Sequence, residues 1–292
     1  KTSILLKYGK HLKDKINTFS GDFLSSTIKL PENSKVIANP PYANIEQVGT
    51  NWHYTEILKD SKELYAVFFE KILKESIASV ISTPYSFISG HKFYSLRKIL
   101  NLYNGEIYSF DNVPGNIFCG RKHGIFNTNT SNSVRAAITV VRKDNSNVFK
   151  LTPLIRFKQS ERTELLTTKT LDSFLSNKQQ KISLHHPMYY KCFKQLQPLY
   201  DRLIEKSENH TLSELLSNSG YSLSMPNTCR YFTSAYAGIL NRNGQIKLIL
   251  GDEQSFNYVF CLLNSSFAYW HWRLYDGGIT YPLSLLKQLP IL

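Results

Sequence analysis

Four consecutive residues, Asn39-Pro40-Pro41-Tyr42, carry most of the chemistry that the sequence suggests. They stand at the end of a short apolar run, 35–39, which predicts a buried strand stopped by the two prolines. A loop at the end of such a strand in an open α/β sheet faces the crevice where ligands bind. The same residue types also suit a plain turn, so the motif alone leaves that interpretation open.

The groups in this loop suit activation of the exocyclic amine of adenine, whose lone pair is delocalised into the ring. The Asn39 side-chain oxygen and the Pro40 carbonyl oxygen can each accept one hydrogen of that amine, which returns the lone pair for attack on a methyl sulfonium. Pro41 helps to fix the carbonyl direction, and dipoles fixed in advance need little reorganisation. Stacking of Tyr42 on the base, worth about 1–3 kcal/mol, would partly offset the cost of flipping the base out of a duplex.

The motif and its neighbours in the chain resemble the γ-class N6-adenine DNA methyltransferases of bacterial type II and IIG restriction–modification systems. The resemblance rests on segments that occur in the order expected for that family. Besides the motif itself, they are residues 20–24, 64–71, 80–87 with 96–100, 116–118 with 136–141, and 262–266 with 289–291.

The resemblance implies a role for S-adenosylmethionine as cofactor and for duplex DNA as partner. It implies that Asp22 hydrogen-bonds the adenine amino group of the cofactor and that Phe23 packs on the cofactor's adenine ring. A turn or helix-cap role for Asp22 stays open. No metal site is expected, because no Cys/His cluster has ligand spacing.

The polar loop 111–133 follows a predicted strand and is the place of a second base-stacking ring in the resemblance. Phe118 is the candidate, with Phe126 as a rival and a plain core role as the alternative. Arg121 and Lys122 lie in the same loop and are candidates for contact with DNA phosphates, although a solvated loop explains them equally well.

Short apolar runs alternate with helical patterns in the first half, which predicts an α/β layered sheet. The resemblance implies a partial Rossmann-like class I methyltransferase sheet in residues 1–155 and a C-terminal mixed α+β target-recognition domain in 156–292. The expected strands are 35–39, 78–83, 106–110, 136–142 and 246–250, and the expected helices are 61–77, 93–102 and 196–206.

One departure from the family concerns the cofactor site. Its members begin with a Gly-rich loop and an acidic residue on the next strand, and the 38 residues before Asn39 contain neither. We therefore expect a fragment, one subunit of a split enzyme or a decayed copy. The sheet would then lack its central first strand and expose an apolar edge for a missing methyltransferase segment or subunit.

Composition agrees with a nucleic-acid-binding protein without requiring one. The 292 residues include 35 Lys and Arg against 22 Asp and Glu, a net charge of +13, and 13% are aromatic. The 42% apolar content excludes a disordered chain. Four cysteines in a chain of this length favour a reducing cytoplasm, and no segment predicts a membrane span.

Three functions follow from the sequence. The first is a site-specific, S-adenosylmethionine-dependent DNA adenine N6-methyltransferase, represented here by its catalytic and recognition portion. The second is a degenerate or split-subunit DNA-binding module without methyl transfer of its own, which the missing Gly-rich loop favours. The third is a protein glutamine N5-methyltransferase, a family that shares Asn-Pro-Pro-Tyr. The long C-terminal part, 156–292, argues against the third.

Overall fold

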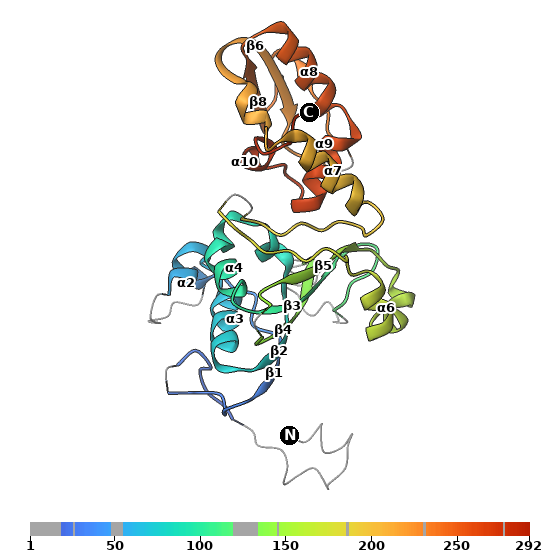
Figure 1. The fold of residues 1–292 in the computed structure, drawn as a ribbon. Coiled ribbons are helices and arrows are strands. Elements are labelled where there is room, and N and C mark those ends of the chain that lie inside the picture. Colours follow the sequence, from blue (N-terminus) through green and yellow to red (C-terminus); the bar gives the residue numbers. More distant parts are fainter. Residues whose placement is uncertain are drawn as a thin grey trace.

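The computed structural model describes residues 19–25, 27–47, 55–118, 134–144, 146–184, 187–229, 232–276 and 278–292. They form a mixed α/β structure with one five-stranded sheet and one smaller three-stranded sheet (Figure 1). The alternation of strand and helix patterns in the sequence thus gave the correct fold class at this level. No helix within these ranges is long and apolar enough to cross a membrane.

The larger sheet holds the candidate site. Its strands lie in the order β1-β2-β4-β3-β5, where β4 is antiparallel to both of its neighbours and the other two pairings are parallel. The end of β1, β2, β3 and β5 and the beginning of β4 therefore share one edge, called here the carboxyl edge. The strands are β1 (Lys35–Ala38), β2 (Ala78–Pro84), β3 (Asn104–Phe110), β4 (Ala136–Arg142) and β5 (Phe149–Ile155).

Three helices pack on one face of this sheet: α2 (Glu56–Ser61), α3 (Leu64–Glu75) and α4 (Tyr94–Leu100) (Figure 1). The predicted helix 61–77 corresponds to α3 and begins three residues later than expected, because Lys62 adopts the left-handed conformation (φ 57°) and separates α3 from α2. The core of this face includes Phe69 and fully buried side chains from β2 and α4. Short 3-10 helices lie at Ile45–Gln47, Tyr85–Ile88, His91–Phe93, Gln159–Glu161 and Leu212–Leu215.

The opposite face is covered only over part of its width. Helices α5 (Arg162–Leu165) and α6 (Thr168–Ser173) follow β5, and a second core cluster joins Leu165 to side chains of β3 and β5. Towards β1 this face is open, since Ile37 is 89% exposed and its register partner Val80 is 36% exposed. The prediction of a buried strand at 35–39 is therefore wrong for the described residues, where β1 is an edge strand packed on one side only.

The smaller sheet and four α-helices form the C-terminal part, drawn at the top of Figure 1. The strands lie in the antiparallel order β7-β6-β8, and Trp272 is a fully buried centre of their core. The elements are α7 (Gln197–Ser207), β6 (Leu216–Pro226), β7 (Tyr236–Ala237), β8 (Gln245–Leu250), α8 (Glu253–Leu263), α9 (Ser266–Tyr275) and α10 (Leu283–Leu286).

The segment after α6 runs back along the larger sheet before it reaches the C-terminal part. Phe149 and Gln180 exchange backbone hydrogen bonds of 3.0 and 2.8 Å, and Ile182 and Tyr189 belong to the core of the larger sheet. The Lys191 amide then donates to the Leu274 carbonyl oxygen at 2.8 Å. Gln180, Ile182 and Tyr189 thus pack with the first half of the chain, and the domain boundary at 155/156 stays a prediction of the sequence.

Candidate active site at the carboxyl edge

The Asn-Pro-Pro-Tyr loop leaves the carboxyl edge at the end of β1. Asn39 is exposed to solvent, whereas Pro40 is buried and Tyr42 is half-buried. The backbone just after the motif is anchored to the start of α3, because the Leu64 amide donates to the Ala43 carbonyl oxygen at 3.0 Å. The loop thus combines a solvent-facing amide with a backbone that is held at both ends.

Tyr42 lies between three side chains that come from distant parts of the sequence. Its hydroxyl lies 3.3 Å from the Ser82 Oγ at the end of β2. Its ring meets the ring of Tyr65 from α3 at a centroid distance of 6.4 Å and that of Phe118 at 6.0 Å, both edge to face. Burial raises the pKa of Tyr42, and the contact with Ser82 acts in the opposite direction without cancelling the rise. The phenol therefore stays neutral at physiological pH.

The structure brings Phe118 to Tyr42, as the stacking hypothesis requires. The segment before it is held from α5, since the Arg162 Nε and Nη2 donate to the Ile117 carbonyl oxygen at 2.8 and 2.5 Å. Because the two rings touch edge to face, a base that stacks between them must replace their mutual contact. Sequence reasoning missed Arg162, which lies in a stretch marked only by its polarity.

Three other candidates of the same loop lie outside the described residues. They are Arg121, Lys122 and Phe126. Their roles in phosphate contact and base stacking stay predictions.

The two candidate cofactor residues lie on the segment that precedes β1. The Asp22 carboxylate is exposed and accepts a hydrogen bond from the Leu24 amide at 3.0 Å. The Phe23 ring stacks on Phe68 of α3 at a centroid distance of 5.3 Å, and the Lys71 ammonium lies 5.5 Å from its centroid. The ring of Phe23 is thus already engaged by α3.

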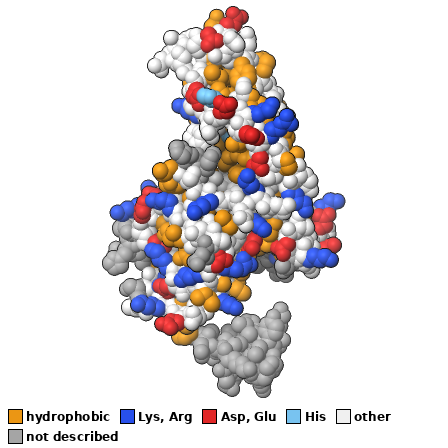
Figure 2. Space-filling model, viewed as in Figure 1, with side chains coloured by type: hydrophobic (Ala, Val, Ile, Leu, Met, Phe, Trp, Pro, Cys, Tyr) orange, Lys and Arg blue, Asp and Glu red, His pale blue; other side chains and the backbone are white. Residues whose placement is uncertain are grey.

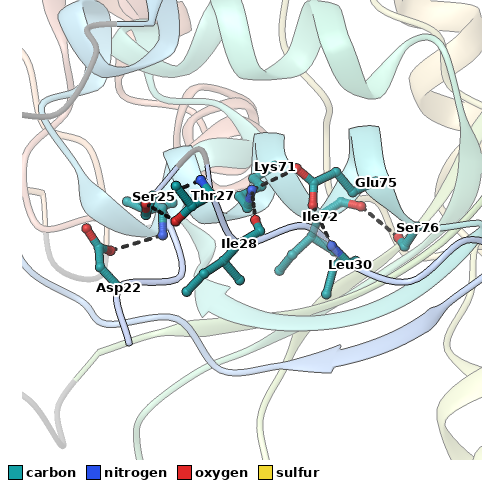
Figure 3. Close-up of polar contacts among 10 residues, drawn as sticks. Asp22, Ser25, Thr27, Ile28, Leu30, Lys71, Ile72, Glu75 and Ser76 are labelled. Atoms are coloured by element: carbon teal, nitrogen blue, oxygen red, sulfur yellow. Dashed lines mark hydrogen bonds and ion pairs between the residues drawn. The ribbon is translucent and has the colours of Figure 1, made fainter. Parts of the chain in front are cut away.

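Polar contacts hold the rest of this segment along α3, as Figure 3 shows. The Lys71 Nζ donates to the Ile28 carbonyl oxygen at 2.7 Å and also pairs with Glu75 at 2.7 Å. Glu75 in turn accepts from the Leu30 amide at 3.0 Å. Two side chains of one helix therefore fix the path of the chain into β1.

These contacts decide how well the described residues suit S-adenosylmethionine. Asp22 offers a carboxylate of the right chemistry for an adenine amino group, but Phe23 serves the packing of α3. Within the described ranges the two residues match the adenine end of the cofactor in residue type and do not enclose it. Nor do three His, Cys, Asp or Glu side chains gather as a metal site within those ranges.

A second group of polar residues lies on the same edge and escaped the sequence analysis. It consists of Asp111, Arg135 and Arg156, which directly flank β3, β4 and β5. Their positions in the sequence could have revealed them, since each is a charged residue next to the end of an apolar run.

Comparison with known proteins gives distant structural similarity only. No protein-family model matches the chain, and no curated protein matches it. A DrdV–DNA complex is 18% identical over 53% of this chain, with a TM-score of 0.36. A nuclease-deletion mutant of the Type ISP restriction–modification enzyme LlaGI, in complex with a DNA substrate mimic, is 17% identical over 51% of the chain (TM-score 0.34).

The ATP-dependent Type ISP restriction–modification enzyme LlaBIII, bound to DNA, is similar over 85% of this chain at 10% identity, with a TM-score of 0.40. The matched regions cover 18%, 17% and 28% of the three solved chains. This chain thus spans less than a third of the length of each of them.

Proposed function

We propose that this chain is the catalytic and recognition portion of a site-specific DNA adenine N6-methyltransferase of a restriction–modification system. The observation that carries the proposal is the loop at the end of β1, where the exposed Asn39 and the aromatic pair Tyr42–Phe118 stand together on the carboxyl edge. This edge is where ligands bind in open α/β sheets. The larger sheet would be part of a Rossmann-like methyltransferase sheet, and the C-terminal part would recognise the DNA target.

In this proposal the protein prepares the amine for attack. The Asn39 Oδ1 and the Pro40 carbonyl oxygen accept the two amine hydrogens, which favours a tetrahedral nitrogen with its lone pair available. S-adenosylmethionine, when bound, supplies the methyl group. Since the Tyr42 phenol stays neutral, Tyr42 acts through its ring rather than as a base. The two hydrogen-bond acceptors are positioned in advance and cost little reorganisation during the reaction.

Base capture exchanges one aromatic contact for another. An edge-to-face pair such as Tyr42–Phe118 is worth about 0.5–1.5 kcal/mol beyond its buried area. Stacking of a flipped base on an aromatic ring contributes about 1–3 kcal/mol per base. The exchange therefore favours the base and offsets part of the few kcal/mol that flipping costs.

The open side of the larger sheet supports the proposal of a further partner. Among the described residues no strand pairs with the outer edge of β1, and this edge together with the 89% exposure of Ile37 would suit a methyltransferase segment or subunit that extends the sheet and completes the cofactor site. Such a partner would supply the contacts to S-adenosylmethionine that Asp22 and Phe23 do not make alone.

The experiment is methyl transfer by the complete gene product to duplex DNA, with labelled S-adenosylmethionine. Asn39→Ala should lower kcat by on the order of 100-fold or more while duplex affinity stays near wild type, because it removes a contact made to the reacting amine. Asn177→Ala, at an exposed position after α6, is the matched control and should keep full activity. An Asn39→Ala variant with wild-type kcat would refute the assigned chemistry.

The engagement of Phe23 by Phe68 and Lys71 favours a second candidate, a DNA-binding module without methyl transfer of its own. The same assay separates the two candidates. A wild-type protein that binds duplex DNA and transfers no methyl group would support the binding module and overturn the enzyme.

A further inference from the structure

The topology of the larger sheet brings three charged residues to the edge that carries Asn39. Asp111 directly follows β3, and Arg156 directly follows β5. Arg135 directly precedes β4, which runs antiparallel to its neighbours, so that its beginning lies at the same edge. We call Arg135 and Arg156 the arginine pair and Asp111 its carboxylate.

The carboxylate is buried and holds both arginines. Asp111 is 3% exposed, and its backbone amide donates to the Ile155 carbonyl oxygen at 2.9 Å. Its Oδ1 accepts from the Arg135 Nε at 2.8 Å, and its Oδ2 accepts from the Arg156 Nε at 2.7 Å. Each oxygen therefore orients one guanidinium, from a carboxylate that is itself fixed by the sheet.

The arginines reach the surface while their carboxylate does not. The side chain of Arg156 is 63% exposed and that of Arg135 is 23% exposed. The bonds to Asp111 use one of the five N–H donors of each guanidinium. Two positive charges are set against one negative charge, so the group presents a net positive charge at the carboxyl edge.

The carboxylate stays ionised across the physiological range. Burial alone would raise the pKa of Asp111, but the hydrogen bond from Arg156 and the charge of Arg135 outweigh it and leave this pKa below its ordinary value. Both arginines therefore keep their orienting partner at neutral pH.

We propose that Arg135 and Arg156, oriented by Asp111, bind the phosphodiester backbone of duplex DNA beside the target-base site. The inference rests on the proposed function. The planar fork of a guanidinium matches a phosphate bidentately. Strands lie about 4.8 Å apart, so Arg135 stands two strands, or about 10 Å, from Asn39, and Arg156 stands about 19 Å away. One DNA strand carries a charge about every 3.4 Å along the axis, so the two arginines can meet phosphates on one side of the flipped base, about three and about six steps along the strand.

The test compares Arg135→Gln and Arg156→Gln with a matched control on the same strand. Arg142 ends β4 at the opposite edge of the sheet, pairs with Glu106 at 2.8 Å and is 51% exposed. Duplex affinity of the full chain is measured by fluorescence anisotropy between 50 and 200 mM salt. Loss of one phosphate contact should lower the slope of log affinity against log salt by about 1. The affinity ratio of wild type to variant should then shrink about three- to fourfold across this range. Arg142→Gln should leave the slope unchanged.

Asp111→Asn tests whether the carboxylate matters because it orients the arginine pair or only because of its charge. This change adds one positive charge to the edge, so a purely electrostatic effect would tighten binding. Orientation by the carboxylate predicts binding weaker than wild type, despite the added charge. Thermal unfolding of each variant is recorded alongside. Should Asp111→Asn fail to fold, Arg156→Gln decides, because its side chain is mostly exposed.

The outcomes distinguish this inference from the proposed function. If wild-type binding falls with salt but the arginine variants behave like Arg142→Gln, the proposed phosphate contact of the arginine pair is overturned. The proposed function then stands. A change in unfolding temperature without a change in DNA affinity would also overturn the phosphate contact and make the group an ion pair that only closes the sheet edge. Absence of duplex binding by the wild type would overturn the proposed function and this inference with it.

Discussion

At the scale of single residues, the proposed reaction gives different tasks to the side chain that would act on the amine and to those that would hold the base. Asn39 is exposed at the end of β1, whereas Tyr42 is packed between Tyr65 and Phe118 and touches Ser82 with its hydroxyl. The ring of Tyr42 contacts two other aromatic rings, and its hydroxyl has one long hydrogen bond. The ring should therefore matter more than the hydroxyl.

Substitution of Tyr42 tests this division. Tyr42→Ala should lower kcat/KM for duplex DNA by about 10- to 100-fold, which corresponds to the loss of about 1–3 kcal/mol of base stacking. Tyr42→Phe keeps the ring and loses only the 3.3 Å contact with Ser82, so its kcat/KM should stay within a few-fold of wild type. Leu102→Ala, at a 65% exposed position between α4 and β3, is the control. Equal losses for the Phe and Ala variants would assign the role to the hydroxyl instead.

The sequence could predict the motif of this site and not its surroundings. Asn39 to Tyr42 are consecutive residues at the end of an apolar run, so a local pattern reveals them. Ser82 and Arg162 reach the site only through strand pairing and helix packing, and no local pattern links them to the motif. Roles in catalysis and cofactor binding stay predictions, because proximity alone does not establish them.

At the scale of elements, the sequence predicted the central strands better than the edge strands and the points where helices end. The expected strand 136–142 coincides with β4, whereas β5 was missed because Lys150, Thr152 and Pro153 interrupt its apolar pattern. The division between α2 and α3 depends on one residue with a positive φ, Lys62, which composition does not reveal. The exposure of β1 depends on which elements cover the sheet, and this is a property of the tertiary structure.

The close pairing of β3 and β4 makes Gly105 a sensitive position. A Cβ atom at Gly105 would lie 1.8 Å from the Val140 carbonyl oxygen and 3.1 Å from the Phe149 ring. Gly105→Ala should therefore lower the free energy of unfolding in urea by about 1–3 kcal/mol, as other overpacked core changes do. At Gly251 the nearest atom would be 3.6 Å away, so Gly251→Ala is the control and should change little. Wild-type stability of Gly105→Ala would contradict the register of β3 and β4.

At the scale of the whole molecule, the excess positive charge is spread rather than gathered in a tail. Figure 2 shows Lys and Arg side chains over both the part that holds the larger sheet and the C-terminal part. Basic side chains of the described residues thus face solvent on both parts, which suits a partner that contacts both. Lys191 connects the two parts, since its ammonium lies over the Tyr85 ring at 5.5 Å and donates to the Tyr275 carbonyl oxygen at 2.7 Å.

Lys191 should give the stability of the protein a distinct pH dependence. Burial lowers the pKa of Lys191 from 10.5 to about 7, so the folded protein releases this proton near pH 7 and the unfolded chain keeps it to about pH 10.5. The unfolded state therefore binds more protons between these values, and the contribution of Lys191 to stability rises with pH across that window. It is least favourable below pH 7, where the buried amine must stay charged.

Lys191→Met removes this titration and keeps an unbranched side chain. The difference in unfolding temperature between the variant and wild type should favour the variant most at pH 6 and shrink by pH 9. Lys194→Met, at an exposed position nearby, should show no such trend. A difference that is independent of pH would mean that the Lys191 amine is not desolvated in the folded protein.

The most direct test of the central claim is the chemical identity of the methylated product. Duplex DNA incubated with the complete gene product and S-adenosylmethionine is digested to nucleosides and separated by chromatography with mass detection. We predict N6-methyladenine at a defined DNA sequence, and its loss in Asn39→Ala but not in Asn177→Ala. Duplex DNA that stays unmethylated, or methyl groups found on glutamine side chains of protein instead, would contradict the assignment of this site to adenine in DNA.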